Sequence, residues 1–428
     1  MTNTTGQETE SVRHRPKRTK AAGIATALLL ALLMLSGCAA AGTAASVPET
    51  TDSESTSSTT TEETITQTAS AAEALMATLS DEQSEQLLYA YDDESKTTTW
   101  SNFPVTFVDR AGLNLDDLSE EQRTAAMEVL EALLSEEGYE TVTGIMDGDE
   151  FLLENSSSTG DSLGQYYVAF FGDPSDSDAW QLQFGGHHLG LNATLDGTDD
   201  SITFAPTHLG SQPAVYTDDE GDEVQPLAGM YESAFAFHDS LTDEQRAELY
   251  QGSEVTNLAC APGGTCSYPT GTGLAGSDLT DEQKQLLLDV VANWVGLSDE
   301  ETTDAALAEI EATLDETYVN WSGATEYDMT RGGGVHFQIS GPDVYVEFAN
   351  QQGSAGADVD GYTTAGWGHV HTIYRDPGND YAGSVTQQEA SGMGGPGGGA
   401  PPGGAPSGEP GDGGAPSGAP EGAPPENG

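Results

Sequence analysis

The chain repeats one helix-start pattern four times. Each copy has a leucine, a serine or threonine, two acidic residues and a glutamine, and the copies begin at Leu79, Leu118, Leu241 and Leu279. The hydroxyl can accept from the amide three residues on, where the glutamine reaches back, and the acids suit the positive end of a helix. After Gln283, the apolar residues Leu287, Val290, Val291 and Trp294 keep a helical period. The pattern therefore predicts four capped helices.

Alternating apolar and polar residues predict strands after these helices in both halves of the chain. In the first half, strand-like runs over 166–171 and 180–184 lead to His187-His188. In the second half, runs over 335–339 and 344–348 precede His369-Val370-His371. We therefore expect an α+β fold with mixed or antiparallel sheets. The repeated order indicates two related halves in one large domain, or a coincidence of common cap and turn signals.

The first 37 residues are typical of an export signal. A basic stretch over 13–20 precedes an uncharged run over 21–35, and Leu35-Ser36-Gly37-Cys38 follows. The run is shorter than the roughly 20 apolar residues of a spanning helix, which favours cleavage over an uncleaved anchor. The last four residues resemble the lipobox of bacterial lipoproteins. The resemblance implies that Cys38 carries lipid and holds the protein on the outer face of the cytoplasmic membrane.

Composition divides the remainder of the chain into three parts. Residues 38–70 are rich in Ser, Thr, Ala and Glu, which predicts a disordered tether. Residues 71–390 contain all the tryptophans and predict the folded domain, with possible halves at 71–220 and 221–390. Residues 391–428 are rich in Gly and Pro without a collagen period, which predicts a disordered tail.

The charge balance is strongly acidic. The chain has 71 acidic and 12 basic residues, for a net charge of −59, and cleavage before Cys38 removes five of the basic residues. Such a surface repels phosphates, so nucleic acid is excluded as a partner. The interpretation is an acidic coat suited to high salt or to surroundings rich in divalent cations.

Only two cysteines remain besides the lipid site. Cys260 and Cys266 flank a Pro-Gly-Gly turn. Outside the cytoplasm, this spacing predicts a disulfide with a small loop rather than a CxxC redox pair or a zinc ribbon.

Four of the eight histidines fall in two short words, His187-His188 and His369-Val370-His371. On a strand, His369 and His371 point to the same face, so they can share one ligand. If the two halves face each other, the four imidazoles could hold a divalent transition metal, with zinc preferred over copper or nickel. The alternatives are histidines that satisfy buried hydrogen bonds, bind a substrate or sense pH. His208, His238 and His336 are weaker candidates.

Arg375 continues the strand that carries His369 and His371. It could orient an anionic substrate group beside the histidines, with Asp376 as a catalytic partner. Alternatively, Arg375 pairs with Asp376 or Asp380 and pins the Arg375-Asp-Pro-Gly-Asn-Asp turn, which we favour. Arg110 and Arg331 raise the same question with less context.

Several ordered motifs resemble the family described as domain of unknown function 3500 (DUF3500). These motifs are Trp100-Ser-Asn-Phe-Pro, Arg110-Ala-Gly-Leu, Phe171-Gly-Asp-Pro, Trp180 through Gly185-Gly-His-His-Leu, Trp321-Ser-Gly, Gly341-Pro, Glu347-Phe-Ala-Asn and His369-Val-His through Arg375-Asp-Pro-Gly-Asn-Asp-Tyr. The resemblance runs from about Leu79 to Ser384 and implies no activity, substrate or cofactor. It also implies a bulky apolar residue at the position of His208, which makes that histidine a less favoured ligand.

Two functions are compatible with these features. One is a metal-assisted hydrolase in which His187, His188, His369 and His371 hold the ion. The other is a non-catalytic surface protein that binds a metal, a peptide or a glycan at the cell envelope. No GxSxG, HExxH or glycine-rich phosphate loop lies in a predicted strand–helix context. Whether the protein is an enzyme, and which small molecule or envelope ligand it binds, stays open at this stage.

Overall fold

A computed structural model describes residues 59–156, 164–252, 257–354 and 356–388. The expected signal peptide, the lipid site Cys38 and the expected tail after residue 390 lie outside these residues. None of the described helices is long and apolar enough to cross a membrane.

The described residues form an α+β fold, as expected. The first half contains α1 (Thr61–Ala77), α2 (Asp81–Leu87), β1 (Leu88–Tyr89), β2 (Leu113–Asn114), α3 (Glu120–Leu133), α4 (Glu136–Asn155), β3 (Tyr167–Phe171), β4 (Ala179–Gly185), β5 (Leu189–Asp196), β6 (Ser201–Thr203) and β7 (Thr207–Ser211). A hairpin of β8 (Tyr216–Thr217) and β9 (Glu223–Val224) follows. The second half contains α5 (Ala228–Ser240), α6 (Asp243–Leu249), β10 (Leu274–Ala275), α7 (Asp281–Val295), α8 (Glu300–Ala312), β11 (Tyr318–Gly323), β12 (Val335–Ser340), β13 (Tyr345–Asn350) and β14 (Val370–Arg375).

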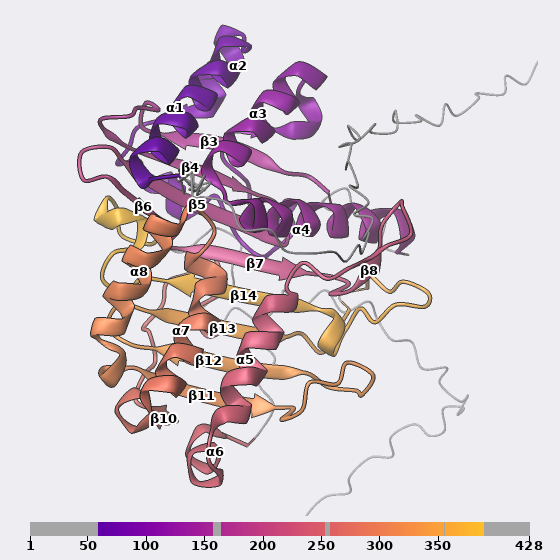
Figure 1. The fold of residues 1–428 in the computed structure, drawn as a ribbon. Coiled ribbons are helices and arrows are strands. Elements are labelled where there is room, and N and C mark those ends of the chain that lie inside the picture. Colours follow the sequence, from indigo (N-terminus) through magenta and orange to yellow (C-terminus); the bar gives the residue numbers. More distant parts are fainter. Residues whose placement is uncertain (1–58, 157–163, 253–256, 355, 389–428) are drawn as a thin grey trace, which may run out of the picture. The chain divides into compact units, whose positions relative to one another are not determined.

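A single 12-stranded sheet runs through both halves (Figure 1). Its main order is β1-β3-β4-β5-β7-β14-β13-β12-β11-β10, and the halves join where β7 pairs antiparallel with β14. Moving outward from this junction, the strands of both halves follow in reverse chain order, as β7-β5-β4-β3 on one side and β14-β13-β12-β11 on the other. The short strand β1 pairs parallel with β3, and Tyr250, just after α6, forms a parallel bridge to Trp321 on β11.

The four capping motifs form as the sequence predicts. Ser80, Ser119, Thr242 and Thr280 cap α2, α3, α6 and α7, and each makes a complete capping box. The boxes also meet in pairs, because Gln83 and Gln122 exchange side-chain amide hydrogen bonds of 3.3 and 3.1 Å. Gln245 and Gln283 do the same at 2.9 and 3.0 Å. Each glutamine thus caps its own helix and also fixes the neighbouring helix start.

The folded region begins earlier than the sequence indicates. Helix α1 occupies Thr61–Ala77, so the predicted tether over 38–70 is wrong for its last ten residues. Thr60 and Glu63 form a capping box, and the buried face of α1 is built from Ile65, Ala69 and Ala72. These mostly small side chains let α1 pack closely on the rest of the domain, although their composition is typical of a linker.

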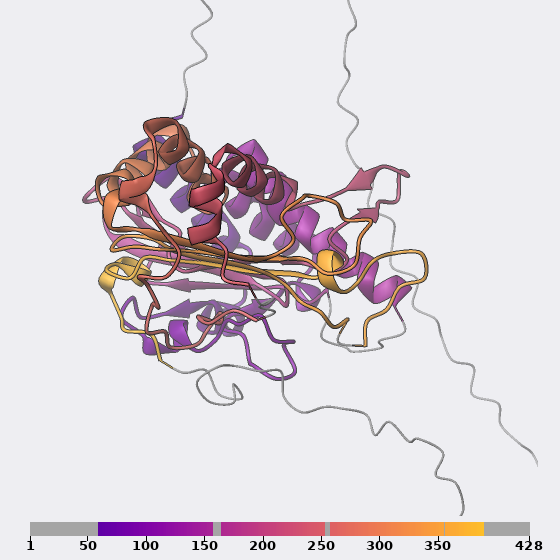
Figure 2. The same ribbon diagram turned by 90° about the horizontal axis from the view of Figure 1, so that it is seen from below.

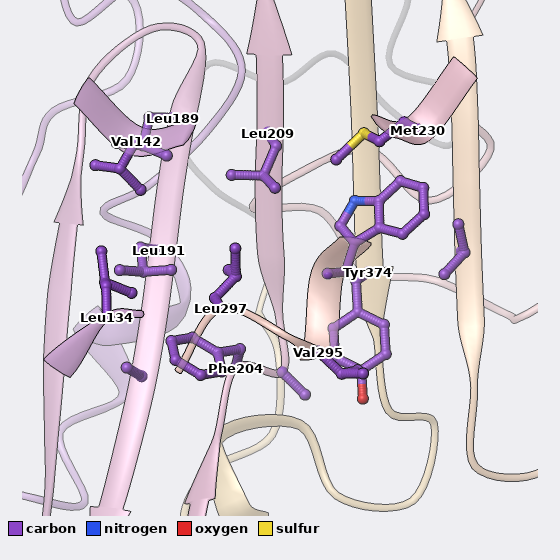
Figure 3. Close-up of a cluster of buried hydrophobic side chains, with 14 of the residues drawn as sticks. Leu134, Val142, Leu189, Leu191, Phe204, Leu209, Met230, Val295, Leu297 and Tyr374 are labelled. Atoms are coloured by element: carbon purple, nitrogen blue, oxygen red, sulfur yellow. The ribbon is translucent and has the colours of Figure 1, made fainter. Parts of the chain in front are cut away.

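The hydrophobic core lies between the sheet and the helices. Figure 2 shows the helices on one face of the sheet and long loops on the other. Leu189 and Leu191 of β5, Leu209 of β7 and Tyr374 of β14 point to the helix side (Figure 3). They meet residues from α4, α5 and α7, including Val142, Met230 and Val295. Since side chains alternate along a strand, neighbours such as His208 and Gly210 face the loop side.

Candidate metal centre

The histidines gather on the loop side of the sheet, where the two halves join. His187 and His188 lie in the turn between β4 and β5, His208 lies on β7, and His369 and His371 lie at the start of β14. Gly210 on β7 pairs with His371, and its amide donates to the His188 carbonyl at 2.7 Å. Gly210 thus lies in space between the His187-His188 turn and the strand that carries His371.

The five imidazole rings lie close together. The ring centroids of His188 and His371 are 5.5 Å apart, and those of His188 and His369 are 5.7 Å apart. His187 stacks on His188 at 4.1 Å, and His208 lies 5.5 Å from His371. The geometry brings together the two histidine words that the sequence singled out, with His208 as a fifth member.

Backbone acceptors fix the tautomers of two of these histidines. His208 Nδ1 lies 2.6 Å from the carbonyl of Thr372, and His369 Nδ1 lies 2.8 Å from the carbonyl of Gly353. A carbonyl can only accept, so both Nδ1 atoms carry the hydrogen and both Nε2 atoms keep a lone pair. His208 Nε2 is buried and has no hydrogen-bond partner among the described residues.

Asp149 orients His188 from helix α4. Its Oδ1 lies 2.5 Å from His188 Nδ1, and its Oδ2 accepts from the Tyr166 hydroxyl at 2.7 Å. His188 Nε2 is buried without a partner among the residues that the structure describes. A carboxylate behind one nitrogen of a histidine is the usual support of a metal ligand, because it fixes the ring and raises its basicity.

His371 is held by a polar contact on each ring nitrogen. Its Nδ1 lies 3.0 Å from Asn102 Nδ2, and its Nε2 lies 3.2 Å from His369 Nε2. His187 differs from the other four because it is partly exposed, although its Nδ1 is buried and has no partner within the described part of the chain. Ligand nitrogens of His187, His188 and His371 lie within 4.8 Å of one another.

Burial keeps the cluster neutral. It lowers the pKa of His188, His208 and His369 to about 3, and it lowers the pKa of His187 and His371 well below the usual range. Burial also raises the pKa of Asp149, against the opposing effects of His187 and Tyr166. Neutral imidazoles with free nitrogen lone pairs are the form that binds transition metals.

Gly210 leaves room at the centre of the cluster. A Cβ atom at Gly210 would lie 3.2 Å from Cε1 of His208 and 3.4 Å from Cδ2 of His188, and 2.8 Å from the carbonyl of Val370. Any side chain at this position would enter the space between the two rings. The donor set, the two unpartnered Nε2 atoms of His188 and His208, and this gap are compatible with a bound metal ion.

The segment from Trp100 to Arg110, called the covering segment below, lies against the cluster, because Asn102 contacts His371 and Arg110 binds the carbonyl of Gly186. Arg110 donates to the carbonyls of Phe103, Ser101 and Gly186 at 2.6, 2.8 and 2.8 Å. These bonds tie the segment to the turn that precedes His187. Burial among these carbonyls lowers the pKa of Arg110 to about 10. The role of Arg110 is therefore to hold the cover in place.

Arg375 and Asp376 do not join the histidines. The Arg375 guanidinium donates to Asp380 at 2.7 Å and to the carbonyl of Gly264 at 2.9 Å. Arg375 lies four residues beyond His371 on β14, or about 13 Å along an extended strand. The structure does not place Arg375 and Asp376 beside the histidines, and their contacts pin the turn after β14, which is the alternative that the sequence favoured.

The remaining candidates lie outside the cluster. His336 on β12 lies 3.5 Å from Glu347, and His238 on α5 packs against Trp321. Arg331 pairs with Glu326 and Asp328 at the surface. A second group of possible metal ligands is acidic. It consists of Asp218, Glu220 and Asp222 on the hairpin of β8 and β9 and is mostly exposed. Cys260 and Cys266 form the expected disulfide, with their Cα atoms 5.0 Å apart.

Sequence reasoning did not single out Asp149 and Asn102, which support the cluster, and it ranked His208 among the weaker candidates. Asp149 follows Val142 and Ile145 and precedes Leu152 at the spacing of a buried helix face, so its position gave a usable signal. His208 was disfavoured because of the family resemblance. Asn102 gave no signal, since its partner His371 lies 269 residues further along the chain.

Comparison with known proteins identifies the family without adding an activity. No curated protein and no solved structure matches the chain at a significant level. The family model described as "Protein of unknown function (DUF3500)" matches residues 61–383, which include every residue of the histidine cluster. The match begins at helix α1 and ends just after the turn that Arg375 pins. The chain belongs to the DUF3500 family.

Proposed function

We propose that this chain is a lipoprotein whose histidine cluster binds one transition-metal ion, with zinc preferred, on the outer face of the cytoplasmic membrane. The observation that carries the metal is the fixed tautomer of His208. Its Nδ1–H donates to the Thr372 carbonyl, so its buried Nε2 keeps a lone pair that no donor among the described residues meets, and its ring centroid lies 5.5 Å from that of His371. An unsatisfied buried acceptor costs about 1–3 kcal/mol, which a bound cation would offset.

The coordination chemistry supports zinc, copper or nickel over calcium or magnesium. Imidazole nitrogens suit the first group, and carboxylate and carbonyl oxygens suit the second. Ligand nitrogens of His187, His188 and His371 lie within 4.8 Å of one another. The rings of His369 and His208 lie beside this trio, with centroids 5.7 Å from His188 and 5.5 Å from His371. The trio with one further nitrogen, from His369 or His208, would meet the tetrahedral preference of zinc.

The lipid anchor rests on the sequence before the described residues. Leu35-Ser36-Gly37-Cys38 ends an apolar run, and about 20 residues separate Cys38 from the start of α1 at Thr61. Two or three acyl chains on Cys38 would hold the protein durably, because each buried CH₂ contributes about 0.8 kcal/mol. A Cys38→Ala variant that still partitions with membranes, or still carries lipid, would contradict the anchor.

Metal analysis of the untagged protein, purified without chelator, tests the metal proposal. We expect about one equivalent of bound ion and a loss of that ion in Gly210→Ala, whose added methyl group enters the gap between His188 and His208. Gly332→Ala is the matched control, since nothing lies within 4 Å of a Cβ atom there. A wild-type protein that binds no added Zn²⁺, Cu²⁺ or Ni²⁺ would contradict the proposal.

A second candidate function is metal-assisted hydrolysis, favoured by the partial exposure of His187. A catalytic zinc ion keeps one coordination position for water, which must be reached from solvent. His187 is the partly exposed member of the cluster, so water would enter on its side. Hydrolysis of ester, amide or phosphate substrates that is lost in His371→Ala, with the fold intact, would favour the hydrolase. Loss of metal without any such turnover in the wild-type protein would favour a binding protein.

A further inference from the structure

A chain of hydrogen bonds leads from the covering segment into the histidine cluster. Asn102 Nδ2 lies 3.0 Å from His371 Nδ1, and His371 Nε2 lies 3.2 Å from His369 Nε2. His369 Nδ1 then donates to the carbonyl of Gly353 at 2.8 Å. Because the carbonyl of Gly353 can only accept, the hydrogen of His369 lies on Nδ1, and His369 Nε2 keeps a lone pair.

With Asn102 Nδ2 lying against His371 Nδ1, the hydrogen of neutral His371 belongs on Nε2. The Asn102 amide donates to His371 Nδ1, so this nitrogen has the lone pair, and Nε2–H donates to the lone pair of His369 Nε2. Each ring nitrogen of His371 and His369 then has a partner. In this state, His371 and His369 share one hydrogen where a metal ion would need two lone pairs, so the pair is closed to metal.

A half-turn of the Asn102 amide produces the opposite state. Asn102 Oδ1 is buried and has no partner among the described residues. After the rotation, Oδ1 would accept from His371 Nδ1–H, and Nε2 would carry a lone pair. The ring stays neutral, because one proton leaves Nε2 for solvent and one arrives at Nδ1. Two lone pairs 3.2 Å apart repel each other unless a cation lies between them.

We infer that Asn102 is a positioning residue that sets the tautomer of His371 and thereby switches the His369–His371 pair between a hydrogen-bonded form and a metal-binding form. The inference rests on the proposed metal site and adds the residue that decides whether one pair of its ligands is open to metal. Asn102 lies between Trp100, which packs over Gly190, and Phe103, whose carbonyl Arg110 holds. The amide therefore approaches His371 from a segment with fixed ends.

The tautomer of His371 can be measured without metal, by ¹⁵N NMR of histidine-labelled protein after chelation. We expect the hydrogen on Nε2 in the wild-type protein and on Nδ1 in Asn102→Asp, because a carboxylate only accepts. With Zn²⁺ bound, the wild-type protein should show Nδ1–H. A metal-free wild-type protein with Nδ1–H would overturn the inference, whether or not the protein binds metal.

Metal affinity gives the second measurement, by competition of the protein with a chelator for Zn²⁺. We expect Asn102→Asp to bind about tenfold more tightly than the wild-type protein, and Asn102→Leu about tenfold more weakly, as is typical of outer-shell partners. Asn155→Asp, on the exposed end of α4, adds the same charge away from His371 and should change nothing. Equal affinities of Asn102→Asp and Asn102→Leu would overturn the switch. Failure of every variant and of the wild-type protein to bind Zn²⁺ would instead contradict the metal site, and the NMR result would then decide on Asn102 alone.

Discussion

Asp149 is the residue on which the orientation of His188 depends. It is fully buried in α4 and contacts His188 with one oxygen and Tyr166 with the other. A buried carboxylate without a cation nearby is costly, since burial raises its pKa and favours the neutral form. A metal ion on His188 would compensate that cost through the ring. The cost of burying the Asp149 carboxylate is therefore consistent with a site that gains its positive charge when a metal ion binds.

Replacing Asp149 by Asn separates its contribution to metal binding from its contribution to folding. We expect Asp149→Asn to bind Zn²⁺ about 10 to 100 times more weakly, because the amide orients His188 less firmly and adds no negative charge. The metal-free variant should unfold at the same or a higher temperature, since a buried charge is removed. Glu150→Gln, one residue further on α4, removes the same charge as a control. Unchanged Zn²⁺ affinity of Asp149→Asn would contradict the assigned role.

Lys96 is a buried cation that the sequence did not single out. Its side chain is fully buried, donates to Ser384 at 3.1 Å and lies 4.5 Å above the ring of Tyr91. Burial lowers the pKa of Lys96 to about 8, in part opposed by Asp92 and Asp93. The ammonium therefore links the end of the folded chain to the first half at an electrostatic cost.

The lowered pKa of Lys96 predicts a pH-dependent stability. Between about pH 8 and pH 10.4, the unfolded chain keeps the proton that the folded protein has released. Unfolding then takes up a proton, so Lys96 makes the free energy of unfolding rise with pH in this window. Below pH 8, both states are protonated and the full desolvation cost is present. Chemical denaturation should show that the free energy of unfolding of the wild-type protein, relative to that of Lys96→Met, increases from pH 7.5 to pH 9.5. A constant difference would rule out the shifted pKa.

At the scale of elements, the features that the sequence predicted are helix starts, which depend on local hydrogen bonds. The capping boxes at Ser80, Ser119, Thr242 and Thr280 need only residues within one turn, and all four form. Helix α1 was missed because its buried face is largely alanine and threonine, which cover little apolar area. Its stability comes from packing against the domain, which no local pattern records.

The candidate site was predictable only in part, for the same reason. His187 and His188 follow β4, and His369 and His371 lie at the start of β14, so topology alone brings them together once β7 pairs with β14. The groups that orient the rings are Asp149 on α4, Asn102 in the covering segment and the carbonyl of Gly353. They lie 39, 269 and 16 residues from the histidines that they contact. The sequence order does not determine such contacts.

The paired glutamines link each capped helix to its neighbour and predict a measurable coupling. Gln245 and Gln283 exchange two amide hydrogen bonds, while Gln283 also donates to Ser240 and Gln245 to Asp278. In a double-mutant cycle of Gln245→Ala and Gln283→Ala, each single change should lower the free energy of unfolding by about 1–2 kcal/mol. The double change should cost less than the sum by about 0.5–1 kcal/mol, because the exchanged bonds are lost only once.

Gln83 and Gln122 provide the internal comparison for that cycle. They form the equivalent pair between α2 and α3, with a longer exchange of 3.3 and 3.1 Å. Their coupling energy should be of the same sign and no larger. Strict additivity in both pairs, measured by urea denaturation, would show that the exchanged bonds contribute nothing beyond the separate caps.

At the scale of the whole molecule, the acidic charge sets the conditions under which the fold is stable. With 71 acidic residues against 12 basic ones, ion pairs can neutralise only a minority of the carboxylates. The unpaired carboxylates repel one another more in the compact state than in the expanded unfolded chain, which lowers stability at low ionic strength. Dissolved salt shortens the range of this repulsion from about 30 Å at 0.01 M to about 3 Å at 1 M.

Thermal unfolding as a function of salt tests this account. The midpoint should rise by several degrees between 0.01 M and 0.5 M NaCl and then level off, because the screening length is by then shorter than the spacing between most surface charges. Choline chloride at the same ionic strength should act equally, since screening does not depend on the identity of the monovalent cation. A midpoint that keeps rising linearly to 2 M would instead indicate exclusion of salt from apolar surface, which strengthens burial. A midpoint that is flat or falls with added salt would show that the acidic surface does not limit the stability of the fold.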